Sequence, residues 1–178
     1  MPHSFISTEQ PQNRKALVTI DSTSYPAASP TLTEPASSGQ SSVIYGKGTV
    51  YPSLLKVVPF HELDNATSLG VRVIGWNRYK DTGGFLWVPT LLADVTPAYN
   101  ATGGSIPAED IDGTEMFFFS NLTVAGGVPT VNLYSPGTGA AAGTPPAHFL
   151  VDTVGCEMVM LQFKSSGSSD MGALWYTI

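Results

Sequence analysis

The sequence predicts an all-β protein, an antiparallel β-sandwich of jelly-roll type that carries an extended N-terminal arm. Two observations predict this fold class. Short apolar segments recur between turns that are rich in glycine and proline, of which the 178 residues include 18 and 14, and this spacing is typical of sandwiches and barrels. In addition, no segment of ten or more residues repeats its apolar side chains at the helical period.

The first 42 residues differ in composition from the rest and are predicted to form the arm, which leaves 43–178 as the sandwich domain. They contain 14 Ser and Thr and 5 Pro residues, and their one apolar cluster lies at 16–20. Such a segment buries too little surface to fold alone. We therefore expect it to dock on the core of its own subunit or on a neighbouring subunit, with Leu17, Val18 and Ile20 as contact residues.

The segment from residue 43 to residue 79 carries the first predicted strands. Residues 43–45 are β-branched or aromatic and end at a glycine, and residues 54–60 are an apolar run with a proline near its end. Residues 69–79 alternate in the manner of a strand. One face of this strand carries Val71, Val73 and Tyr79, and the other carries Arg72, Ile74, Trp76 and Arg78.

A hairpin is predicted at the end of this strand. The turn residues of 81–84, Asp-Thr-Gly-Gly, join it to the apolar run at 85–88. Residues 91–95 continue the second strand beyond Pro89, either as an edge or as a bulge.

The second half of the chain carries the remaining predicted strands, which are short and separated by turns. They lie at 116–120, 122–124, 131–134, 149–153, 156–163 and 173–178. The segment 156–163 is apolar on both faces, so both faces should be covered. One cover is the core of the sandwich, and the other is the N-terminal arm or a second subunit.

The charge pattern excludes several classes of protein. The net charge is −6 with only 8 basic residues, which argues against nucleic-acid binding. The sequence contains no run of 18 apolar residues, the length that a membrane-spanning helix needs. The first residues lack the apolar stretch of a signal peptide, and Cys156 is the one cysteine, so we expect the chain to fold in a reducing cytoplasm.

The densest acidic segment, residues 109–115, contains a weak candidate calcium site formed by Asp110, Asp112 and Glu115. Carboxylates at alternate positions before a glycine can surround Ca²⁺. The segment lacks the third Asp or Asn and the distal Glu of an EF-hand loop. A solvated turn between strands is the interpretation that we favour, and the sequence predicts no cofactor.

The residues that could support catalysis favour structural interpretations. His61 stands near two carboxylates, but no nucleophile motif or second nearby His accompanies it. Cys156 lies at the head of an apolar strand with no basic neighbour to activate it. The Asp-Thr-Gly letters at 81–83 match the loop of aspartic proteases in a single copy only. The sequence therefore predicts that the protein is not an enzyme.

A patch of arginine and tryptophan residues is the best candidate for partner binding. Arg72, Trp76 and Arg78 share one strand face, and Trp87 follows in the hairpin. Arg and Trp are enriched at protein interfaces. Aromatic faces on a rigid sandwich also bind glycans, so a protein partner and a carbohydrate remain open alternatives.

The C-terminal region resembles a pattern found in virion proteins of tailed bacteriophages. Asp152 and Gly155 form a corner that precedes the apolar strand 156–163, a Ser/Gly turn at 164–169 and the final strand 173–178. The low charge, the loops rich in Thr, Gly and Pro, and the extended arm are similar to capsid decoration (cement) proteins.

This resemblance implies a non-enzymatic protein of the virion that binds and stabilises the outside of the capsid shell. Its partner would be the major capsid protein, and it would associate with itself, typically as a homotrimer with an arm over its neighbours. The resemblance carries over no catalytic residues. The alternative is a carbohydrate- or receptor-binding module of a phage tail or head fibre.

Overall fold

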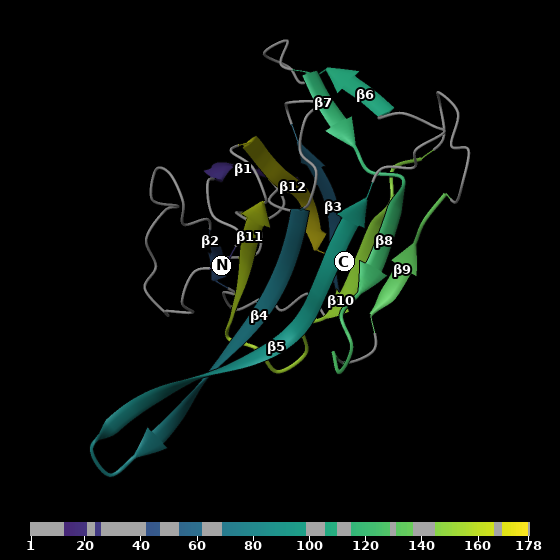
Figure 1. Ribbon diagram of the computed structural model, residues 1–178. Coiled ribbons are helices and arrows are strands. Elements are labelled where there is room, and N and C mark those ends of the chain that lie inside the picture. The colour runs from purple at the N-terminus through teal and green to yellow at the C-terminus, as the bar shows by residue number, and fades with distance from the viewer. Residues whose placement is uncertain are drawn as a thin grey trace, which may run out of the picture.

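A computed structural model of the chain describes residues 13–20, 24–25, 42–46, 54–61, 69–98, 106–109, 115–128, 131–136, 145–165 and 169–177. All regular elements within these ranges are β-strands, and their pairings are antiparallel. The strands form two sheets (Figure 1) whose facing side chains share one core. The predicted all-β sandwich is therefore confirmed, and its jelly-roll connectivity stays a prediction.

The larger sheet runs in the order β1-β12-β3-β10-β9 over the described residues. Its strands are β1 (Asn13–Ile20), β12 (Ser169–Thr177), β3 (Leu54–His61), β10 (His148–Asp152) and β9 (Asn132–Tyr134). The end of β3 also pairs with β7 (Glu115–Phe118), and β7 pairs with β6 (Ile106–Glu109). The β6–β7 pair extends from one end of the sandwich (Figure 1).

The smaller sheet runs in the order β2-β11-β4-β5-β8 over the same described residues. Its strands are β2 (Ser42–Gly46), β11 (Met158–Ser165), β4 (Leu69–Asp81), β5 (Gly84–Ala98) and β8 (Asn121–Val124). As predicted, β4 and β5 form a hairpin, and β5 continues through Pro89 with a register irregularity opposite Val73 and Ile74.

The core lies between the two sheets and is built from aliphatic and phenylalanine side chains. Val71 and Val73 on β4 face Val57 on β3 and Phe149 on β10 within one buried cluster. Each of these four side chains is fully excluded from solvent. Full burial of one such side chain stabilises the fold by about 1.5–3 kcal/mol, so the alternation predicted for β4 directs its valines toward the largest source of stability.

The N-terminal region contributes an edge strand to the larger sheet. β1 pairs with β12 of the same chain, from Asn13 opposite Tyr176 to Ile20 opposite Ser169. Of the two docking sites considered for the predicted arm, its own subunit is therefore the one that residues 13–20 use. The division of the chain at residue 42 stays a prediction.

Two strands differ from the sequence-based prediction because pairing, not side-chain pattern, determines their extent. β12 begins at Ser169 rather than at 173, since its polar first residues, Ser169 and Asp170, pair with Ile20 and Thr19 of β1. β6 contains Pro107 and shows no apolar alternation, and it is a strand because it pairs with β7. A single-sequence pattern has no signal for such partners.

The prediction that the strand near the C-terminus is covered on both faces is confirmed. β11 keeps its side chains buried from Met158 to Phe163. Val159, Leu161 and Phe163 belong to the core, whereas Met158 and Met160 belong to a separate cluster. This second cluster lies on the outer face of the smaller sheet, the face turned away from the core.

Candidate functional site

The most prominent surface feature is the far half of the β4–β5 hairpin, which projects beyond the sandwich (Figure 1). β11 accompanies β4 only as far as Trp76, and β8 accompanies β5 only from Val95 onward. Within the described residues, Asn77–Asp81 and Gly84–Val88 therefore pair only with each other, and Pro89–Leu91 continue the same edge of β5 opposite Ile74–Trp76. We call this part of the molecule, residues 77–91, the projecting hairpin.

The turn at the tip of the projecting hairpin explains the Asp-Thr-Gly-Gly sequence. The Asp81 Oδ1 atom accepts hydrogen bonds from the Thr82 main-chain nitrogen at 2.6 Å and from its hydroxyl at 3.2 Å. Gly84 has a φ of 136°, which residues with a Cβ rarely adopt. The carboxylate of Asp81 therefore closes an exposed turn, in a place where the sequence also matched a protease loop.

The projecting hairpin exposes large apolar side chains on both of its faces. Phe85, Leu86 and Tyr79 are 67%, 59% and 57% exposed. Leu86 lies directly opposite Tyr79 on one face, whereas Phe85 and Trp87 alternate onto the other face. Exposed apolar side chains that gather in one place indicate an interaction site more strongly than scattered ones do.

Arg78 organises the face that carries Phe85 and Trp87. Its guanidinium carbon lies 5.4 Å from the centroid of each of these two rings, within the range of a cation–π contact. The Arg78 Nε atom also forms an ion pair with Glu157 Oε2 at 2.6 Å. The side chain therefore links the exposed aromatic rings to the body of the sandwich.

Glu157 holds the base of the projecting hairpin through both of its oxygens. Its Oε1 atom accepts a hydrogen bond of 3.0 Å from the Arg78 main-chain nitrogen, and its own nitrogen donates to the Trp76 carbonyl at 2.8 Å. The main-chain and side-chain hydrogen bonds from Arg78 keep the pKa of Glu157 below 4.5. Glu157 directly precedes β11, and its carboxylate therefore continues the hydrogen bonding along β4 beyond the first residue of that strand.

Trp76, which the sequence places in the partner-binding patch, is not accessible to a partner. It is 2% exposed and packs with Ile74, Met158 and Met160 in the outer-face cluster, where the half-buried Trp87 joins them. Its buried Nε1 atom has no acceptor among the described residues. Trp76 thus supports the root of the hairpin, and its assignment as a contact residue is corrected by its burial.

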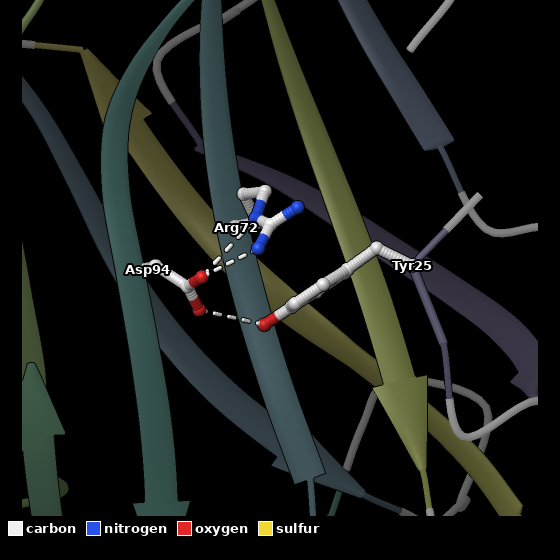
Figure 2. A network of polar contacts seen from close by, with 3 residues as sticks. All are labelled: Tyr25, Arg72 and Asp94. Carbon is white, nitrogen blue, oxygen red and sulfur yellow. Dashed lines mark hydrogen bonds and ion pairs between the residues drawn. The ribbon is translucent and has the colours of Figure 1, made fainter. Parts of the chain in front are cut away.

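A polar network lies further along the outer face of the smaller sheet, where Tyr25, Arg72 and Asp94 meet (Figure 2). Arg72 and Asp94 are direct cross-strand neighbours on β4 and β5. The Asp94 Oδ2 atom accepts hydrogen bonds from Arg72 Nη2 at 2.7 Å and from Nε at 3.2 Å. Its Oδ1 atom accepts a hydrogen bond of 3.0 Å from the Tyr25 hydroxyl.

The ring of Tyr25 is held by cations as well as by this hydrogen bond. The Arg72 guanidinium lies 4.0 Å and the Lys164 ammonium 4.6 Å from the ring centroid. Any Cβ at Gly70 would collide with the Tyr25 hydroxyl and the Lys164 side chain. Burial, and then the Asp94 carboxylate, raise the pKa of the Tyr25 hydroxyl far above 10.0. The network therefore fixes the N-terminal region to the smaller sheet.

The remaining predicted site residues lie in several different places. Leu17, Val18 and Ile20 are in β1, where the structure describes the main chain only. Glu115 of the candidate calcium site pairs with Glu109 at the loop end of the β6–β7 hairpin. Asp110 and Asp112 lie outside the described residues. No group of three or more metal-ligating side chains gathers in the described part of the chain.

The residues considered for catalysis are not brought together. His61 is the last residue of β3 in the larger sheet, opposite Met171 and Phe117. Asp81 lies at the tip of the projecting hairpin, and Cys156 is buried in the core against Gly75, where it forms no disulfide.

Comparisons with protein-family models, with curated proteins and with solved structures found no match to this chain. Among the residues that the structure describes, no helix has the length and apolar character needed to cross a membrane. The site must therefore be interpreted from its own geometry.

Sequence reasoning identified the hairpin and two of its side chains, Arg78 and Trp87, together with Arg72 further along β4, but it missed the partners that position the two arginines. Tyr25, Asp94 and Glu157 are separated by 22 to 79 residues from the arginines or the carboxylate that they bind. No spacing rule connects residues so far apart. An available signal was the run Phe-Leu-Trp-Val at 85–88, which sets large apolar side chains directly after the polar turn at 81–84.

Proposed function

We propose that this protein is a non-enzymatic structural protein of a virus particle, made in the host cytoplasm, which binds and stabilises the outside of the capsid shell. The observation that carries the proposal is the projecting hairpin, whose Tyr79, Phe85 and Leu86 side chains are each more than half exposed. A protrusion with exposed apolar side chains on both faces suits docking on a second protein surface better than it suits chemistry.

The proposed mechanism is mechanical. The two faces of the hairpin would bury Phe85, Leu86 and Tyr79 at the junction between major capsid protein subunits, where removal of apolar area from water drives binding. The ion pair between Arg78 and Glu157 would hold the hairpin at one angle to the sandwich, so that little conformational entropy is lost on binding. Repetition over a symmetric shell, and association of the protein with itself, would add avidity.

The contacts of Arg78 favour a protein partner over the carbohydrate alternative. Sugar stacking needs open aromatic faces. Trp76 is buried, and the guanidinium of Arg78 lies over both Phe85 and Trp87. Tyr79 keeps an exposed ring on the opposite face of the hairpin, and a single ring makes a small platform for a glycan.

The test is co-sedimentation of the full chain with shells of the virus whose genome encodes it. We expect the protein to sediment with the shells and to saturate at a fixed ratio to the capsid subunit. The double variant Phe85→Ser with Leu86→Ser should lower the affinity by at least about tenfold, since two exposed apolar anchors are lost.

A matched control is Leu133→Ser on β9, which removes an apolar side chain that is 39% exposed at the far edge of the larger sheet. It should sediment like the unchanged protein. Absence of shell binding by the unchanged chain, or equal loss in both variants, contradicts the proposal. A glycan array that binds the unchanged chain and fails to bind Tyr79→Ala would instead establish the carbohydrate alternative.

A further inference from the structure

The two edges of the projecting hairpin differ in how they are protected against pairing with another strand. On the β4 side, Arg78, Lys80 and Asp81 are charged, and the carboxylate of Glu157 binds the Arg78 nitrogen. On the β5 side, residues 84–93 carry no charge at all. Charged side chains and covering groups are the usual means by which proteins prevent edge pairing, so among the residues that the structure describes the β5 edge is open and the β4 edge is guarded.

The register of the hairpin shows which main-chain groups reach the open edge. The Arg78 nitrogen and the Trp76 carbonyl both bond to Glu157, so they point away from β5. In an antiparallel ladder the residues opposite them, Trp87 and Pro89, then point their own groups away from β4. By the alternation of the strand, Phe85 does the same, and proline is tolerated here because its missing N–H would face solvent.

We propose that the open edge of β5 pairs with the same edge of a second copy of this chain. Antiparallel pairing about a two-fold axis opposite Leu86 places Phe85 of each copy beside Trp87 of the other. The N–H and C=O groups of both residues then find partners, and the two aromatic rings form a cross-strand pair on one face. The two hairpins become one four-stranded ribbon.

The occupant that fits both the register and the lack of charge on this segment is a second copy of the chain. A two-fold contact sets identical segments against each other, which repels any strand that carries a net charge. The segment 84–93 is neutral, so self-pairing meets no repulsion, although the whole chain has a net charge of −6. Two-fold pairing also closes on itself, because it consumes the open edge of both copies and leaves only the guarded β4 edges outside.

This pairing uses the edge of the hairpin, whereas the proposed shell contact uses its faces, so the two proposals fail separately. A chain that binds shells as a monomer contradicts only the pairing. A dimer that ignores shells contradicts only the proposed function.

The test is sedimentation equilibrium of the full chain from about 10 µM to about 1 mM, the range of moderate to weak association. We expect a mass that approaches twice the 18.8 kDa of one chain. Phe85→Lys should weaken the dimer by at least about tenfold, since it replaces the aromatic pair with a charge at the edge.

The control is Tyr79→Lys, which removes an aromatic ring that is also more than half exposed from the guarded strand of the same hairpin. It should leave the dimer unchanged. A second readout is hydrogen exchange, in which the amides of Phe85 and Trp87 should slow as the protein concentration rises. A chain that stays monomeric, a trimer, a dimer in which these amides exchange freely, or equal effects of the two lysine variants would each overturn the proposal.

Discussion

Replacement of Tyr25 by Phe tests how firmly the polar network holds the N-terminal region to the smaller sheet. The variant removes one atom, the hydroxyl oxygen that donates to Asp94 Oδ1 at 3.0 Å. The ring stays, and with it the contacts to Arg72 and Lys164. Asp94 also keeps its two hydrogen bonds from Arg72, so the carboxylate is not left unpaired.

The expected loss of stability follows from these contacts. A hydrogen bond to a charged group contributes about 1.5–3 kcal/mol. The Asp94 and Arg72 side chains are 14% and 31% exposed, so water replaces part of the lost bond, and the expected decrease in the free energy of unfolding is about 1–2 kcal/mol. For a chain of this size, each kcal/mol lowers Tm by about 2–4 °C.

The measurement is urea unfolding of the full chain, followed by circular dichroism. The matched control is Tyr79→Phe, because the Tyr79 hydroxyl is exposed and makes no hydrogen bond within the described residues. That control should change stability by less than about 0.5 kcal/mol. Equal midpoints for the two variants would show that the Tyr25 hydroxyl does not contribute to stability, and the network would then be only a surface contact.

Two further predictions concern the same sheet. Burial raises the pKa of Tyr25 in the folded protein above 10.0, so the unfolded chain loses this proton first as the pH rises. The free energy of unfolding should therefore fall above about pH 10. Urea unfolding at pH values below and above about 10 measures this decline, which Tyr25→Phe should flatten. Gly75→Ala should lower the free energy of unfolding by about 1–3 kcal/mol, because the new methyl group meets the Cys156 sulfur and Leu92. Gly83→Ala, at the open tip of the hairpin where an added Cβ meets nothing, should leave thermal stability within about 0.5 kcal/mol, and a result in the reverse order would contradict the packing derived for β4.

The sequence predicted those parts of the fold for which local pattern and local turn chemistry agree. The alternation of β4 directed Val71 and Val73 into the core, and the Asp-Thr-Gly-Gly turn was identified as the end of a hairpin. The double-sided apolar pattern of β11 indicated two covers. The prediction failed where a neighbour supplies the reason for a strand, as β1 does for the polar start of β12.

The candidate site was predictable only in part. Arg78 and Trp87 were correctly placed together, because they lie opposite each other in a hairpin whose register the turn determines. Trp76 looked equally suitable on the same strand face, and only the packing of Met158 and Met160 beside it shows that it is buried. A strand pattern tells which face a side chain occupies, but it does not tell whether that face is covered.

By itself, the sequence determined the class of the fold, the position of the hairpin and the low charge that leaves much neutral surface, since these depend on neighbours a few residues apart and on composition. The tertiary structure alone decided which aromatic side chains reach solvent, that Tyr25 binds Asp94 across 69 residues of chain, and that, within the described ranges, Glu157 covers one edge of the hairpin while no strand pairs with the other. The physical reason is that burial and edge pairing depend on strands that are distant in sequence, and their approach is determined by the packing of the whole sandwich.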